Sequence, residues 1–322
     1  MRTKLFTVII AALAAGTAAL LPGLAAAEYP EKPITMLIGF RPGGAVDTTG
    51  RLLAASMEKV LGQPVVGVTK AGGGGTVMAT TLKTAAPDGY TIGMGASAAY
   101  ALAPQLNTKL TYKIDDFDHI ATVSIPQDAI VVRTESPWKT LDDMLAEAKA
   151  KNRPLSFASQ VSIATLMTMA ISNKSGVQFN VIPVKGGAVG IQEVLGGHVD
   201  VTWSGSGWHQ QVAAGKMRAL ASMGPKRNAG YPNLPTLKEL GYNFEFVDTF
   251  MLSAPKGLPK EVLAKLSEAV KASLTPEFSK NLISKMRLVT DYRGPAETTA
   301  YLHKQHDDVA PLVAELKKKE KK

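Results

Sequence analysis

Near the start of the chain, three short apolar runs alternate with two amphipathic segments, and glycine-rich turns divide them. The runs at 35–40, 65–69 and 90–94 have the length of strands, whereas residues 46–61 and 76–86 repeat apolar side chains with a helical period. A βαβαβ order closes into a parallel sheet with right-handed crossovers. The alternation resumes after about residue 137, with strands expected at 155–158, 181–184, 199–203 and 217–223. The pattern predicts an α/β protein built from two such units.

Helix signals complete this outline. Thr140 followed three positions later by Asp143 predicts an N-terminal cap, and Pro259 is expected at the first position of a helix. A final helix is expected from about Pro295 to the lysine-rich end of the chain.

Residues 1–27 have the layout of a secretory signal peptide. Arg2 and Lys4 precede an uncharged stretch, and Ala25, Ala26 and Ala27 provide small residues before Glu28. A retained anchor is the alternative, but its apolar run is marginal against the roughly 20 residues that a membrane span requires. We expect cleavage after Ala27 and a mature protein in the periplasm.

The mature chain of 295 residues is long enough for two domains. Two β-prone stretches, 119–133 and 244–254, are where the chain is expected to cross between them. A double crossing predicts a first lobe formed by 28–124 and 249–322, with a second lobe, 125–248, inserted into it.

Charge and composition narrow the ligand class. Loss of the signal peptide lowers the net charge from +9 to +7, which favours an anionic solute. The basic residues are scattered without an aromatic–basic stripe, so nucleic acid is not expected. The chain has no cysteine, which excludes thiol nucleophiles and cysteine-based metal sites.

The strand–helix junctions are rich in glycine and small hydroxyl residues. They comprise Pro42-Gly43-Gly44, Gly72 to Gly75, Gly95 to Ser97 and Ser159 to Ser162. Helix N-termini expose unpaired N–H groups, and ligands of open α/β sheets lie beyond the carboxyl ends of the strands. We therefore expect an anion site in which Asp47 either caps the first helix or orders water on the ligand.

Other chemistries fit the sequence poorly. No Gly-Lys-Ser or Gly-Lys-Thr follows the glycine run, so a P-loop is not expected. Ser97 lacks the nucleophile elbow of hydrolases, and His303 with His306 fits a solvated helix face better than a metal site. Trp203 and Trp208 are expected to pack, although an aromatic platform is the alternative. We expect no catalytic residue, metal or cofactor.

Several segments together resemble the Bug family, the extracytoplasmic receptors of tripartite tricarboxylate transporters. The segments are 29–34, 40–47, 61–66, 85–91, 194–200, 214–221 and 234–236, spread over nearly the whole mature chain. The resemblance implies a type II periplasmic-binding-protein fold, a two-lobed Venus flytrap with two hinge strands. It also implies a monomer that binds a small carboxylate through backbone amides, hydroxyls and water, and permease subunits as partners.

The resemblance carries the family's ligand contacts to positions in both lobes. The expected contacts are Phe40, Pro42, Gly43, Gly44, Asp47, Gly74 and Ser97 in the first lobe, and Ser159, Gln160, Ser162, Gly187 and Ser204 in the second. The sequence departs from the family at Phe157, Gln160 and Val161, where small residues are usual. Arg41 is expected either to pair with a distal ligand carboxylate or to face solvent.

The sequence thus predicts a binding protein rather than an enzyme, taking a di- or tricarboxylate, an aromatic carboxylate or an acidic amino acid. A periplasmic sensor that presents its ligand-bound form to a sensor kinase is the alternative. An exported hydrolase using Ser97 is a third, weaker hypothesis.

Overall fold

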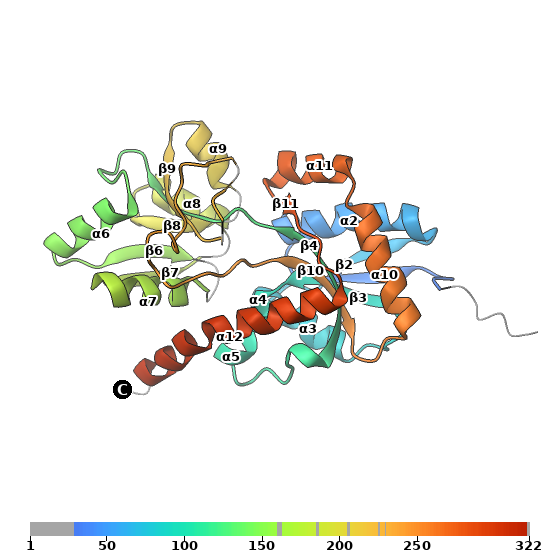
Figure 1. Cartoon of the computed structure of the whole chain (residues 1–322). Coiled ribbons are helices and arrows are strands. Elements are labelled where there is room, and N and C mark those ends of the chain that lie inside the picture. Colours follow the sequence, from blue (N-terminus) through green and yellow to red (C-terminus); the bar gives the residue numbers. More distant parts are fainter. Residues whose placement is uncertain are drawn as a thin grey trace, which may run out of the picture.

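The computed structural model describes residues 29–159, 163–184, 187–204, 207–224, 226–228 and 230–320. The expected signal peptide and the site candidates Gln160 and Ser162 lie outside these residues. Two sheets organise the chain into two lobes, joined by two crossing segments (Figure 1).

The first sheet combines a parallel half with an antiparallel half. Its six strands, in spatial order, are β11 (Val289–Thr290), β4 (Phe117–Ile125), β10 (Phe250–Pro255), β3 (Thr91–Ala96), β1 (Ile34–Ile38) and β2 (Val65–Thr69). β1 pairs with β2 and β3 in parallel, as the βαβαβ pattern predicts. β10 is antiparallel to β3 and β4, which the sequence did not predict.

Helices cover this first sheet on both sides. They are α2 (Ala45–Leu61), α3 (Thr76–Lys83), α4 (Ala98–Ala101), α5 (Ala103–Leu106), α10 (Lys260–Ser273), α11 (Pro276–Met286) and α12 (Pro295–Glu320), with short 3₁₀ turns η1 (Gly73–Gly75) and η2 (Ile114–Asp116). α10 begins at Lys260, so the expectation that Pro259 opens the helix was one residue early: Pro259 is its N-cap, with an extended ψ of 139°.

The second sheet lies between the two crossing segments in the sequence. Its strands, in spatial order, are β7 (Phe179–Pro183), β6 (Leu155–Ser159), β8 (Val201–Ser204), β5 (Ala129–Arg133) and β9 (Met217–Ser222). Its helices are α6 (Leu141–Ala150), α7 (Ile163–Ser175), α8 (Gly187–Leu195) and α9 (Trp208–Ala213). α6 begins with the predicted capping box, because Thr140 and Asp143 each accept the other's backbone N–H.

The crossing segments are short. The first is residues 126–128, between β4 and β5, and the second is residues 243–249, which lead into β10. β4 and β10 pair in antiparallel register with Ser124 opposite Phe250, so the two segments leave the first sheet side by side.

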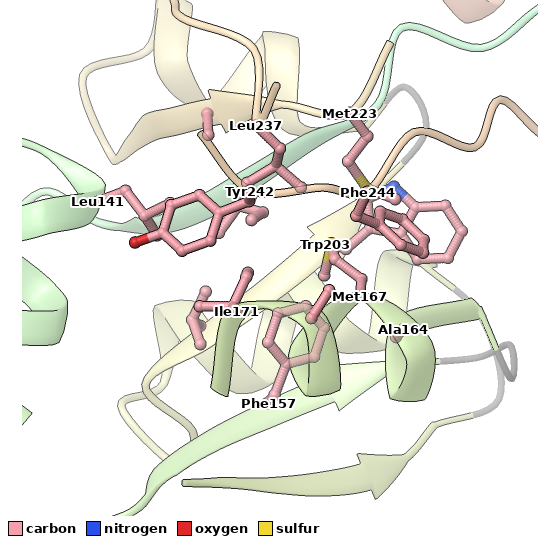
Figure 2. Packing of buried hydrophobic residues seen from close by; sticks show 14 of the residues in the cluster. Leu141, Phe157, Ala164, Met167, Ile171, Trp203, Met223, Leu237, Tyr242 and Phe244 are labelled. Atoms are coloured by element: carbon pink, nitrogen blue, oxygen red, sulfur yellow. The ribbon is translucent and has the colours of Figure 1, made fainter. Parts of the chain in front are cut away.

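α12 packs against both lobes. Leu302 is fully buried with residues of α3, α4 and β10, whereas Val309 and Val313 belong to the core of the second lobe. That core also contains Met167, Trp203 and Phe244, which lie together in Figure 2. No helix built from the described residues is both long and apolar enough to cross a membrane.

Candidate functional site

The β1–α2 junction forms an exposed turn, and the buried side chain of Asp47 stabilises it. Gly43 has a φ of +81°, which favours glycine, and its N–H donates to Asp47 Oδ2 over 3.0 Å. Asp47 Oδ1 accepts a hydrogen bond from Arg51 Nε over 2.9 Å, and the carboxylate is 3% exposed. Asp47 therefore stabilises the turn before α2 through the Gly43 N–H and does not cap the helix, so the predicted capping role is not the one observed.

The first-turn amides of α2 are left for an external acceptor. Gly44 N donates to the Arg41 carbonyl within the turn, and no described side chain caps the helix. Elsewhere α6 and α11 carry threonine caps, Thr140 and Thr275. An uncapped 17-residue helix behind exposed Gly43 and Gly44 presents unpaired N–H groups and a partial positive charge to solvent.

The other junctions of the first lobe converge on this turn. Gly72 to Gly75 all have positive φ, and Gly74 is exposed with a φ of +65°. A Cβ added at Gly75 would lie 3.3 Å from the ring of Phe40 and 3.2 Å from Ala99 Cβ. Phe40 and the β2–α3 and β3–α4 junctions are therefore in contact, as the shared carboxyl edge of parallel strands requires.

Ser97 directly follows β3, and its polar groups already have hydrogen-bond partners. It is 0% exposed; its N–H donates to the Thr249 carbonyl, and its hydroxyl accepts from Thr249 N and approaches the Val247 carbonyl at 3.3 Å. In this conformation Ser97 fastens the second crossing segment to the first lobe. Its hydroxyl contacts main-chain groups and the Asp248 side chain rather than a histidine, so the hydrolase hypothesis gains no support.

In the second lobe, the described candidates also lie at strand ends. Ser159 ends β6, Ser204 ends β8, and both are buried, while Gly187 opens α8. Ser204 pairs with Ala129 in β5, which joins it directly to the first crossing segment. Direct contact of these residues with a ligand stays a prediction.

The tryptophans pack in the core. Trp208 is fully buried, stacks on His209 with ring centroids 3.7 Å apart, and donates from Nε1 to the Gln127 carbonyl. Trp203 is 6% exposed within the second-lobe core. His303 hydrogen-bonds to Asp115 on the surface, and the described residues contain no cluster that could hold a metal.

Sequence reasoning missed two acidic residues on the crossing segments. Burial, followed by the charge of Asp248, raises the pKa of Asp128 to about 8. Burial also raises the pKa of Asp248 to about 6, against a hydrogen bond from the Ala98 amide that lowers it. The only sequence signal was their position within apolar stretches, and nothing in the sequence placed them near one another.

Comparison with known families points to one group. Residues 49–315 match the family model described as the tripartite tricarboxylate transporter family receptor. A protein of Cupriavidus necator, the UPF0065 protein in the gbd 5′ region, is 38% identical over 281 residues, covering 84% of this chain and 85% of its own. Protein BugT of Bordetella pertussis is 32% identical, with the same coverage of 84% and 85%.

Solved structures agree with the sequence relatives. The periplasmic binding protein BugD superposes with a TM-score of 0.74 at 32% identity, covering 90% of this chain and 98% of its own. MatC from Rhodopseudomonas palustris, solved with bound malate, superposes with a TM-score of 0.77 at 26% identity, covering 88% of this chain and 100% of its own. These matches confirm the predicted two-lobed binding-protein fold.

Proposed function

This chain belongs to the tripartite tricarboxylate transporter family of receptors, and from that premise we propose that it captures a small dicarboxylate in the periplasm and delivers it to permease subunits in the membrane. The observation that carries the proposal is the uncapped N-terminus of α2 behind exposed Gly43 and Gly44. Backbone N–H groups and the helix dipole together favour a negatively charged group at that position.

The relatives support the choice of a dicarboxylate. MatC carries malate, and the two chains share 26% identity over nearly all of MatC. A second carboxylate of the same ligand would reach the small residues at the ends of β6 and β8. Contact with both lobes is required, because a ligand shifts the balance between open and closed forms only through different contacts with each.

The first test measures thermal stabilisation of the purified protein by malate, succinate, citrate and benzoate. A ligand present at about 100 times its Kd adds roughly 2.7 kcal/mol to the unfolding free energy. We expect at least one dicarboxylate to raise Tm. If none of the four changes Tm at millimolar concentration, the proposed ligand class is wrong.

The second test places a side chain over the α2 N-terminus. Gly44 has a φ of −76°, and a Cβ added there meets only the Arg41 carbonyl at 3.4 Å, so Gly44→Val should fold. The isopropyl group should block approach to the first-turn amides and weaken binding at least tenfold, about 1.4 kcal/mol.

Gly230→Val is the matched control for this substitution. Its added Cβ also meets a single oxygen at 3.4 Å, that of Asn228, but Gly230 lies in the second lobe, outside every expected ligand junction. The control should bind the same dicarboxylate with unchanged affinity. Unchanged affinity in Gly44→Val would instead remove the α2 terminus from the site.

A further inference from the structure

Two carboxylates lie on the crossing segments, one on each. Asp128 ends the first segment and Asp248 lies in the second, two residues before Phe250. Because Phe250 pairs with Ser124 in antiparallel register, the segments run alongside each other where they leave the first sheet. Asp128 is 6% exposed, whereas Asp248 is partly exposed.

Each carboxylate is attached to a different lobe by hydrogen bonds of its own segment. The Asp128 carbonyl accepts from Met223 N, and the next residue, Ala129, pairs with Ser204 and Ser222 in the second sheet. Asp248 Oδ1 accepts from Ala98 N over 2.9 Å, at the start of α4 in the first lobe. A change in the angle between the lobes therefore changes the separation of the two carboxylates.

Val247, the residue before Asp248, forms several hydrogen bonds through its carbonyl oxygen. The Val247 carbonyl accepts from Gln305 Nε2 over 2.7 Å and from the Tyr301 hydroxyl over 3.1 Å, both on α12. Thr249 N also donates to it over 2.8 Å. These hydrogen bonds hold Asp248 in place relative to the first lobe.

The pair lacks a cationic partner within the described part of the chain. Asp128 Oδ1 has no hydrogen-bond partner of normal geometry there, although the Trp203 indole lies nearby and slightly lowers the pKa of Asp128. Around Asp248, the neighbouring titratable group on α12 is Tyr301, whose ring stacks with Arg293 at 4.2 Å. Arg293 is itself paired with Asp291. On the side of Asp128, the titratable neighbour is His209, which stacks on the Trp208 ring bonded to the Gln127 carbonyl and has the charge of Arg287 nearby.

Two negative charges on adjacent segments, one of them buried, are costly without a counter-charge, and one retained proton removes their repulsion. We propose that Asp128 and Asp248, on neighbouring crossing segments anchored to different lobes, repel each other when both are ionised, and that loss of the last proton from the pair shifts the lobes to a different arrangement. The pair would thereby make the balance between open and closed receptor respond to periplasmic pH. This proposal does not depend on which ligand the receptor binds.

The test measures the distance between the lobes in the absence of ligand. The chain has no cysteine, so Lys59→Cys in α2 and Lys149→Cys in α6 introduce unique positions for a pair of pH-insensitive dyes. Single-molecule energy transfer is recorded from pH 5.5 to 9. We expect a change in transfer efficiency with a midpoint between pH 6 and 8.

Two substitutions show whether the pair causes the change. Asp128→Asn keeps the shape of the protonated residue, and in Asp248→Asn the amide oxygen can still accept from Ala98 N, so at least one variant should fold. Each should keep the efficiency that the unsubstituted protein has at low pH. Asp307→Asn, a 79% exposed carboxylate on α12, should respond to pH as the unsubstituted protein does.

Either of two results would overturn the proposal. One is an energy-transfer efficiency in the unsubstituted protein that is the same at pH 5.5 and pH 9. The other is a full pH response in a folded Asp128→Asn or Asp248→Asn variant. A purely structural role for the pair would alter stability in these variants while leaving the pH response of the lobes intact.

Discussion

At the scale of single residues, Asp47 holds two partners with its two oxygens. One oxygen accepts the Gly43 N–H within the β1–α2 turn, and the other accepts from Arg51 one helical turn further along α2. The buried carboxylate thus keeps Gly43 in its left-handed conformation. Because Asp47 stabilises the turn from its buried side, the first-turn amides of α2 remain accessible to solvent.

Separate substitutions distinguish the two contacts. Asp47→Ala should lower the unfolding free energy by about 2 kcal/mol, because hydrogen bonds to a buried charged group are lost. Arg51→Ala should cost under about 1 kcal/mol, because the Arg51 side chain is 48% exposed and the pair is screened. Urea unfolding measures both; an equal loss would assign the stability to the ion pair rather than to the turn.

The clustering of the first-lobe candidate residues could be predicted because glycine-rich junctions are local signals. Gly43, Gly44 and Gly74 follow apolar strand runs, and parallel strands carry the junctions to one edge. The burial of Ser97 could not be predicted, since it depends on Thr249, 152 residues away. The proximity of Asp128 and Asp248 depends in the same way on the register between β4 and β10.

At the scale of elements, the parallel half of the first sheet could be predicted from the spacing of apolar residues along the sequence. The predicted strand at 65–69 matches β2, and the helix expected at 46–61 matches α2 to within one residue. β11 was missed because two residues carry no periodicity. The insertion of β10 antiparallel between β3 and β4 was missed because strand order is set by tertiary packing.

α12 provides a third connection between the lobes. Its residues Tyr301, Leu302 and Gln305 contact the first lobe and the crossing segment, whereas Val309 and Val313 contact the second-lobe core, with Asn173 on α7 bonded to Glu315. The helix can be seen extending along both lobes in Figure 1. Its contact with α7 must therefore adjust whenever the lobes rotate.

A core substitution on α12 tests this connection. Val313→Ala should lower the unfolding free energy of the second lobe by about 2 kcal/mol. Tryptophan fluorescence measures this directly, because Trp138, Trp203 and Trp208 all lie between the two crossing segments. Val60→Ala, on a 48% exposed valine of α2, is the matched control and should change stability by less than about 0.5 kcal/mol. A fluorescence transition unmoved by Val313→Ala would show that α12 stabilises the first lobe alone.

At the scale of the whole molecule, two histidines and two aspartates with shifted pKa values change the folding stability with pH in opposite directions. Burial lowers the pKa of His119 and of His209 to about 4, so each favours the folded state less as pH falls below 6.5. Asp128 and Asp248 have raised pKa values, so the folded state binds more protons than the unfolded state above pH 3.8, and they favour folding less as pH rises. Between pH 4 and 6 the two effects largely cancel.

Above neutral pH the cancellation ends, and Asp128 dominates. The unfolded carboxyl is fully ionised there, while the folded one still titrates with a pKa of about 8. The stability gained from protonated Asp128 should therefore be lost as pH rises, and the unfolding free energy should fall by about 1 kcal/mol from pH 7 to pH 9. Urea unfolding at pH 7, 8 and 9 measures this slope. Asp128→Asn should abolish it and be the more stable protein at pH 9, whereas Asp307→Asn should keep it; the same slope in Asp128→Asn would mean that another group takes up the proton.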